Sequence, residues 1–393
     1  MKKTTCLLPL ALGTFGLGIT EYVMMGILPD IAKTMKVSIP LAGNFISSYA
    51  LGVVFGSILL VLLGRTKPLK NILIVLVSIF TLANFSLAFI NHYSLFCLVR
   101  FIAGLPHGAF FGVGAIVASK IADNGKENSA VAKMVSGMAI ANLCGIPLGT
   151  FISHAFSWRI IFIFVGLFGL FILYTVLKLV PRIAPPETKS FISQFKIFKS
   201  LSVWILILAV ILGNGGIFCW YSYINPLLVN LSGIKPQFVS MLMILAGAGM
   251  CIGTGLAGKL SDKFKPSIIA SLIQLIACKS LILIFLFGHI SILSIILMFI
   301  CTGCLFGVST PQQTLLIKYA KGGEMLGASC SQISFNLGNA IGAFVGGIPI
   351  SLGYGYQYTA LYGSVFTVIG FILLYFFYLR YEYIRTTQWK GKQ

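Results

Sequence analysis

Hydrophobic and polar positions alternate along this chain on a long scale: twelve apolar stretches are joined by short polar connections. Each stretch is about 20 residues long, the length that an α-helix needs to cross a lipid bilayer. The ~10-residue alternating segments typical of a membrane β-barrel do not occur in the sequence. The pattern predicts an all-α integral membrane protein with twelve transmembrane helices, over about 6–28, 41–63, 70–91, 94–120, 130–153, 159–180, 201–229, 236–258, 267–288, 290–317, 325–352 and 355–381.

Composition agrees with this interpretation. Of the 393 residues, 58% are hydrophobic and only 9% are charged, whereas soluble domains carry about 25% charged residues. The net charge of +20 raises the alternative of a nucleic-acid partner. Most Lys and Arg residues, however, lie in one alternate set of connections, and the other set holds Lys33, Lys36, Arg159 and Lys235. The positive-inside rule therefore predicts cytoplasmic termini, and we expect the lipid bilayer, not nucleic acid, as the partner of this charge.

The chain is predicted to consist of two similar halves. The only long polar connection covers 181–200, with prolines and charges, and it falls at the midpoint. We interpret it as a cytoplasmic linker between an N-terminal six-helix bundle, 1–180, and a C-terminal six-helix bundle, 201–393. Short matches at an offset near 197 support a duplication, such as Pro29 with Pro226, each taken to end a membrane helix. Two parallel halves with a site between them are typical of transporters.

Ionisable residues inside the apolar stretches mark candidate chemistry, because each costs at least ~2.5 kcal/mol at the centre of a membrane helix. Glu21 and Arg100 lie at similar predicted depths in one half, so we expect a contact between them, direct or through water. Burial favours the protonated carboxyl and Arg100 favours the ionised form, so Glu21 either exchanges a proton or forms a structural ion pair that does not titrate. His107 shares the face of Arg100 and either relays protons, contacts substrate or only packs. Asp30, at the outer mouth, is a solvated end residue or passes protons to Glu21.

The second half holds no acid in its predicted helices, and its polar residues are neutral amides accompanied by aromatic rings. Such stripes turn inward in lipid, where they either join helices or bind cargo. Rings stack on apolar faces and amides bind hydroxyl groups, so the set suits a neutral or amphipathic solute such as a sugar. With two residues from the first half, the predicted substrate-binding residues are Met25, Asn142, Asn214, Phe218, Trp220, Tyr221, Gln332, Asn336 and Asn339.

Three motifs resemble those of the major facilitator superfamily, most closely its twelve-span drug:proton antiporter branch and the AraJ-type sugar exporters within it. The loop motif occurs as Gly258-Lys-Leu-Ser-Asp262-Lys263 and, without its usual acid, as Gly64-Arg65-Thr-Lys67-Pro-Leu-Lys70. The second motif is Leu98-Val-Arg100-Phe-Ile-Ala-Gly104. The third, Gly145-Ile-Pro147-Leu-Gly149-Thr150, resembles the antiporter motif. The resemblance implies conformational roles for Arg65, Lys70, Gly145, Pro147, Gly149, Gly258, Asp262 and Lys263. Simple topology charges are the alternative for Arg65 and Lys70.

The sequence and the resemblance together predict a proton-coupled exporter of a small neutral or amphipathic solute. It is expected to work by alternating access in the bacterial cytoplasmic (inner) membrane. A proton-coupled importer or an uncoupled facilitator of the same fold is the alternative. No G-x-x-x-x-G-K-[ST] nucleotide loop occurs in the sequence, so ATP is not the expected energy source. We expect no enzyme activity, no cofactor, no metal and no obligate protein partner, and we expect a monomer.

Overall fold

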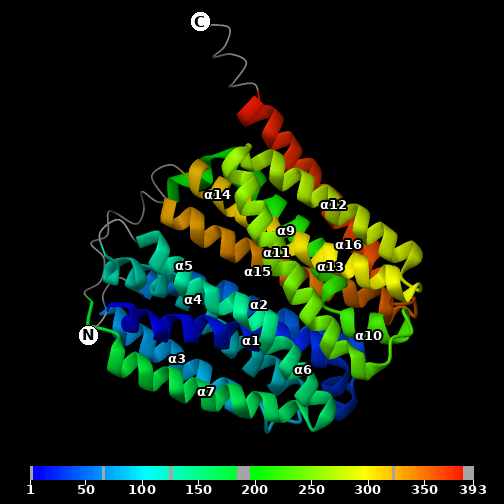
Figure 1. Ribbon diagram of the computed structural model, residues 1–393, viewed down its shortest axis with the longest axis horizontal. Helices are drawn as coiled ribbons and strands as arrows, with labels where there is room; N and C mark the ends of the chain where they lie inside the picture. The colour runs from blue at the N-terminus through cyan, green and yellow to red at the C-terminus, as the bar shows by residue number, and fades with distance from the viewer. Residues whose placement is uncertain (1–2, 64–66, 124–126, 184–194, 321–323, 384–393) are drawn as a thin grey trace, which may run out of the picture. The chain divides into compact units, whose positions relative to one another are not determined.

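The computed structural model describes residues 3–63, 67–123, 127–183, 195–320 and 324–383. Twelve helices in these ranges are long and apolar enough to cross a membrane, which confirms the predicted number. Figure 1 shows them as long helical rods coloured in chain order. Residues of the predicted linker at 184–194 lie outside the described ranges, as does Arg65.

Two compact units divide the chain: one holds Met1–Thr188 and Lys235–Gly247, and the other holds Lys189–Ile234 and Ala248–Gln393. The helices of the first are α1 (Lys3–Met35), α2 (Ile39–Leu63), α3 (Leu69–Leu87), α4 (Tyr93–Ile121), α5 (Glu127–Ile140), the π-helix η1 (Ala141–Gly145), α6 (Ile146–Ala155) and α7 (Trp158–Leu179). It also contains the 3-10 turn η3 (Pro236–Phe238) and the start of α11 (Val239–Lys263).

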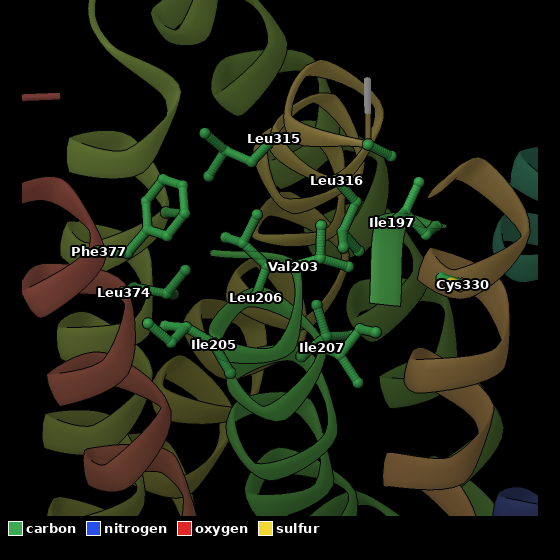
Figure 2. Packing of buried hydrophobic residues seen from close by; sticks show 14 of the residues in the cluster. Ile197, Val203, Ile205, Leu206, Ile207, Leu315, Leu316, Cys330, Leu374 and Phe377 are labelled. Atoms are coloured by element: carbon green, nitrogen blue, oxygen red, sulfur yellow. The ribbon is translucent and has the colours of Figure 1, made fainter. Parts of the chain in front are cut away.

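The second unit holds the rest of α11 and five further membrane spans. Its elements are the 3-10 turn η2 (Phe195–Lys199), α9 (Leu201–Tyr221), α10 (Ile224–Asn230), α12 (Pro266–Phe287), α13 (Ser291–Gly307), α14 (Ser309–Tyr319), α15 (Glu324–Ser351), α16 (Tyr358–Phe377) and the π-helix η4 (Tyr378–Tyr383). Its core joins Val203 and Leu206 of α9 to Leu315 of α14 and Phe377 of α16 (Figure 2). Ile197 of η2 is buried in the same cluster, so this part of the predicted linker packs on the unit.

Prolines explain where three predicted membrane helices are interrupted. A proline in a helix lacks the N–H that would bond to the carbonyl four residues earlier. Pro226 therefore leaves the Ser222 carbonyl without its helical hydrogen bond, and α9 ends at Tyr221. Pro311 likewise leaves the Gly307 carbonyl without one, and α13 ends at Gly307. Pro147 has the same effect in the antiporter motif, where the chain adopts the π-helix η1 and the Ile146 N–H bonds to the Ala141 carbonyl, five residues back.

One predicted helix end was wrong: Pro29 lies inside α1, which continues to Met35. Pro226 lies in the short helix α10, beyond the end of the membrane helix α9 at Tyr221. Neighbouring helices hold the segment beyond Pro29: Ser153 donates to the Asp30 carboxylate at 2.6 Å, and the Trp158 indole donates to Thr34 at 3.1 Å. These tertiary contacts offset the one backbone hydrogen bond that a proline removes, and a local pattern of residues does not show them.

Candidate functional site

Close packing of α2 on α4 brings the candidate site of the first unit together. A Cβ added at Gly104 would lie 2.1 Å from the Tyr49 carbonyl, and one added at Gly108 would lie 2.2 Å from the Val53 carbonyl. Gly52 and Gly56 on α2 are equally crowded by the α4 backbone. Small residues spaced four apart on both helices allow this approach in a membrane. As a result, side chains on α2 reach the charged residues of α4.

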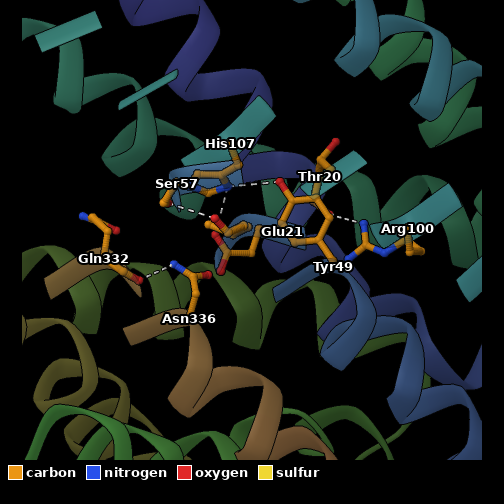
Figure 3. A network of polar contacts seen from close by, with 9 residues as sticks. Thr20, Glu21, Tyr49, Ser57, Arg100, His107, Gln332 and Asn336 are labelled. Atoms are coloured by element: carbon orange, nitrogen blue, oxygen red, sulfur yellow. Dashed lines mark hydrogen bonds and ion pairs between the residues drawn. The ribbon is translucent and has the colours of Figure 1, made fainter. Parts of the chain in front are cut away.

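Glu21, on α1, is buried against His107 of α4. The Glu21 Oε2 and His107 Nδ1 atoms are 3.5 Å apart, and both side chains are almost fully buried (Figure 3). The imidazole stacks on Phe111 at a centroid distance of 5.2 Å, which fixes the plane of its ring. The sequence left open whether His107 only packs; the structure places it beside the carboxylate that was predicted to carry the proton.

Arg100 is held by main-chain carbonyls and by an aromatic ring. Its Nε donates to the Phe45 carbonyl at 3.1 Å, and its Nη1 donates to the Thr20 carbonyl at 2.9 Å. The guanidinium carbon lies 4.3 Å from the centroid of the Tyr49 ring, a cation–π contact. Within the part of the chain that the structure describes, Arg100 Nη2 has no hydrogen-bond partner.

Tyr49 of α2 connects these two parts of the site. Its ring lies beneath Arg100, and its hydroxyl is 3.0 Å from His107 Nδ1. Arg100 and His107 are seven residues apart, about 10 Å along one face of α4, and Tyr49 bridges that distance. Glu21 and Arg100 thus belong to a connected group of four residues, with Tyr49 and His107 in between (Figure 3). The expected contact between Glu21 and Arg100 themselves stays a prediction.

Sequence reasoning missed Tyr49, because the sequence around a tyrosine in an apolar helix does not show which residue it will contact. The structure places Asp30 in a different cluster, where it is half-buried and accepts from Ser153. Its Oδ2 also lies 3.5 Å from His154 Nε2. Nine residues of α1, about 14 Å, separate it from Glu21.

The antiporter motif lies against α1. A Cβ at Gly145 would meet Ile19 at 2.5 Å, and one at Gly149 would meet Val23 at 2.6 Å. In η1, Asn142 is 2% exposed, and its Oδ1 has no hydrogen-bond partner within the described ranges. The motif thus sets how closely this segment approaches the helix that carries Glu21, and Met25, one turn further on α1, is fully buried.

In the second unit, the predicted polar residues lie on α9 and α15. Asn214 Nδ2 donates to Gln312 Oε1 at 3.2 Å, and Asn336 Nδ2 donates to the Gln332 carbonyl at 3.0 Å. Asn339 is completely buried, and Gln332 is half-buried.

The predicted aromatic residues of this unit are buried and contact other rings. Phe218 makes an edge contact with Phe335 at 5.4 Å, and the rings of Trp220 and Tyr221 are 6.0 Å apart. The rings of Phe218, Trp220 and Tyr221 are at most 1% exposed.

Several buried polar atoms of this unit have no hydrogen-bond partner among the described residues: Asn214 Oδ1, Trp220 Nε1, Gln274 Oε1 and Nε2, Gln312 Nε2, and Asn336 Oδ1. Buried polar groups are normally hydrogen-bonded, so these atoms are available to water or to a ligand. Sequence reasoning missed Gln274 and Gln312; Gln274 is an isolated amide in an apolar stretch, which was a usable signal, whereas Gln312 lies in the polar run 309–314.

The loop-motif residues have different surroundings. Lys70 Nζ donates to the Leu177 carbonyl at 2.8 Å, so its charge caps the C-terminal end of α7. This contact favours a local structural role for Lys70. Asp262 and Lys263 are exposed at the end of α11, and a Cβ at Gly258 would meet no described atom within 4 Å.

Comparison with known proteins gives three concordant results. The sequence model of the Major Facilitator Superfamily matches residues 10–330. The chain is 42% identical to AraJ of Escherichia coli (strain K12) over 384 residues, 97% of each chain. It is 27% identical to a Helicobacter pylori (strain ATCC 700392 / 26695) protein named "Probable sugar efflux transporter", over 95% of this chain and 94% of the relative.

Among solved structures, a D-xylose-proton symporter superimposes with a TM-score of 0.75, covering 95% of this chain and 97% of the other, at 16% identity. At that identity the likeness concerns the fold alone.

Proposed function

The chain belongs to the major facilitator superfamily, and from that premise we propose that it is a proton-coupled exporter of a small, neutral, hydroxyl-rich or amphipathic solute. It is a multi-pass membrane transporter and not an enzyme. The single observation that carries the proposal of proton coupling is the burial of Glu21 against His107, with Arg100 joined to the same group through Tyr49.

Charge explains why this group suits proton coupling. With Glu21 ionised and His107 neutral, the carboxylate balances Arg100, and the group has no net charge. When Glu21 binds a proton, the charge of Arg100 is left uncompensated in a low-dielectric surrounding, which is costly. Protonation therefore changes the free energy of the conformation that encloses the group. A proton gradient drives the cycle if the inward-open and outward-open states differ in their affinity for that proton.

The second unit supports the proposed cargo. Its buried amides and the Trp220 indole offer donors and acceptors that lack partners among the described residues, and the Trp220 ring lies 6.0 Å from the ring of Tyr221. Hydroxyl groups both donate and accept, so a sugar-like solute matches this mixture, whereas a dication requires acids. The name of the Helicobacter pylori relative supports sugar efflux. We propose that the chain works by alternating access and that both termini are cytoplasmic, as the positions of Lys and Arg predict.

The test uses inverted membrane vesicles with an acidic lumen. Labelled pentoses, hexoses, a nucleoside and a cationic drug are first screened by thermal shift, and the best binder is used for flux. An exporter accumulates it in the lumen as protons leave; one pH unit supplies about 1.4 kcal/mol per proton, roughly tenfold accumulation. A facilitator only equilibrates it, and an importer expels it.

Glu21→Gln is expected to abolish this accumulation while downhill exchange continues, because glutamine resembles the protonated carboxyl and cannot titrate. Uphill transport by Glu21→Gln at the wild-type rate would refute the proposal for Glu21. Tighter binding of dications than of any sugar or neutral drug would refute the proposed cargo class.

A further inference from the structure

A single nitrogen of His107 faces two oxygen atoms. Nδ1 lies 3.0 Å from the Tyr49 hydroxyl and 3.5 Å from Glu21 Oε2 (Figure 3). All three side chains are almost completely buried, so bulk water does not compete freely for these contacts. The arrangement matters only if Glu21 exchanges protons, so the inference below rests on the proposed function.

The chemistry of an imidazole nitrogen makes these two contacts alternatives. Nδ1 either carries a proton and donates it, or has a lone pair and accepts. An ionised carboxylate only accepts, so with Glu21 ionised the favourable form has a proton on Nδ1 that points to Oε2. That bond is charge-assisted and therefore the stronger of the two. The hydroxyl of Tyr49 can donate to Nδ1 only after that proton has left.

We propose that Tyr49 is a positioning residue whose hydroxyl donates a hydrogen bond to His107 Nδ1 when Glu21 becomes protonated. The arriving proton binds the lone pair of His107 Nε2, and the proton on Nδ1 moves to Glu21 Oε2. The group gains one proton, the imidazole ends neutral with hydrogen on Nε2, and the Tyr49 O–H donates to the vacated Nδ1. The 3.5 Å separation shortens on transfer, as such contacts do when a site becomes active.

The position of Tyr49 also passes this change to Arg100. The same ring lies 4.3 Å from the guanidinium carbon, so a movement of the hydroxyl toward Nδ1 moves the ring against the cation. The titratable or charged groups facing Glu21 are Tyr49 from α2 and Arg100 and His107 from α4. The other elements packed on α1 carry further groups of this kind, among them Lys133 on α5, Cys144 on η1, His154 on α6, and Arg159, Tyr174 and Lys178 on α7.

Infrared difference spectroscopy tests the inference without any cargo. The purified full-length protein in detergent is titrated with acid, and the C=O stretch of protonated carboxyl groups is followed. The band that disappears in Glu21→Gln belongs to Glu21. Tyr49→Phe keeps the ring beneath Arg100 but removes the donor that stabilises the protonated state. Its Glu21 band is expected to reach half intensity at a pH lower by up to about one unit. A tenfold shift corresponds to about 1.4 kcal/mol, the size of one hydrogen bond.

Tyr93→Phe is the matched control. The Tyr93 hydroxyl accepts from Asn44 Nδ2 at 2.7 Å across the same α2–α4 interface, fourteen residues from His107. We expect this variant to lose one hydrogen bond and leave the Glu21 titration unchanged.

If Tyr49→Phe does not fold, His107→Asn supplies the second test. Its amide lies near the position of Nδ1 but cannot relay a proton, so Glu21 should protonate at least tenfold more slowly after a pH jump.

The outcomes separate the two proposals. If no titrating band disappears in Glu21→Gln, the proposed function fails. If the band is assigned to Glu21 but Tyr49→Phe leaves its midpoint unchanged or raises it, only the role of Tyr49 is overturned. Unchanged protonation kinetics in His107→Asn would equally refute the relay.

Discussion

The contact between α1 and α6 allows one prediction to be worked out in detail. Gly149→Ala would place a Cβ 2.6 Å from Val23 Cγ2, whereas carbon atoms in contact normally lie about 3.5–4.0 Å apart. The helices must therefore separate by about 1 Å, since the β-branched Val23 has little rotamer freedom. Overpacking of this kind costs about 1–3 kcal/mol. Gly149→Leu enlarges the clash and is expected to block transport in protein that still inserts.

Two further variants make the prediction specific. Gly255→Ala on α11 is the matched control, because its added Cβ meets no described atom within 4 Å and alanine favours helix by about 1 kcal/mol. Val23→Ala in the Gly149→Ala background removes the clashing methyl groups and should restore part of the loss.

The measurements are thermal unfolding in detergent and flux per folded molecule in proteoliposomes. Wild-type stability in Gly149→Ala would refute the close contact. Lost stability with an unchanged flux per folded molecule would show that Gly149 only packs and has no part in coupling.

Two other predictions concern polar groups of each unit. Gln312→Leu removes the partner of the buried Asn214 amide and should cost about 1–3 kcal/mol in thermal unfolding. The double variant with Asn214→Leu should recover stability, and equal losses in the single and double variants would contradict a direct pair. Asp30→Asn should retain uphill transport in the vesicle assay, because Asp30 accepts a hydrogen bond from Ser153 and lies about 14 Å along α1 from Glu21. Loss of coupling in Asp30→Asn would instead make it an essential proton site.

The sequence alone determined the membrane architecture, because the bilayer imposes one length and one composition on every spanning helix. Glu21 and Arg100 were visible for a related reason: an ionisable residue in an apolar stretch is rare enough to stand out. Pro147 could be recognised as a point where the helix loosens, and the π-helix η1 lies there. These features depend on local chemistry, which a reader of the chain can evaluate residue by residue.

Only the tertiary structure decided which groups meet. Tyr49 became part of the site because Gly104 and Gly108 let α2 approach α4 closely. The sequence of a single helix does not determine how that helix is rotated against its neighbour. The same applies to Pro29, where contacts from α6 and α7 carry the helix past a residue that would otherwise end it. Which side chains meet depends on many packing contacts between residues distant in sequence, and each contact contributes little free energy by itself. The chain therefore shows which residues carry charge, and the fold determines which neighbours that charge acts on.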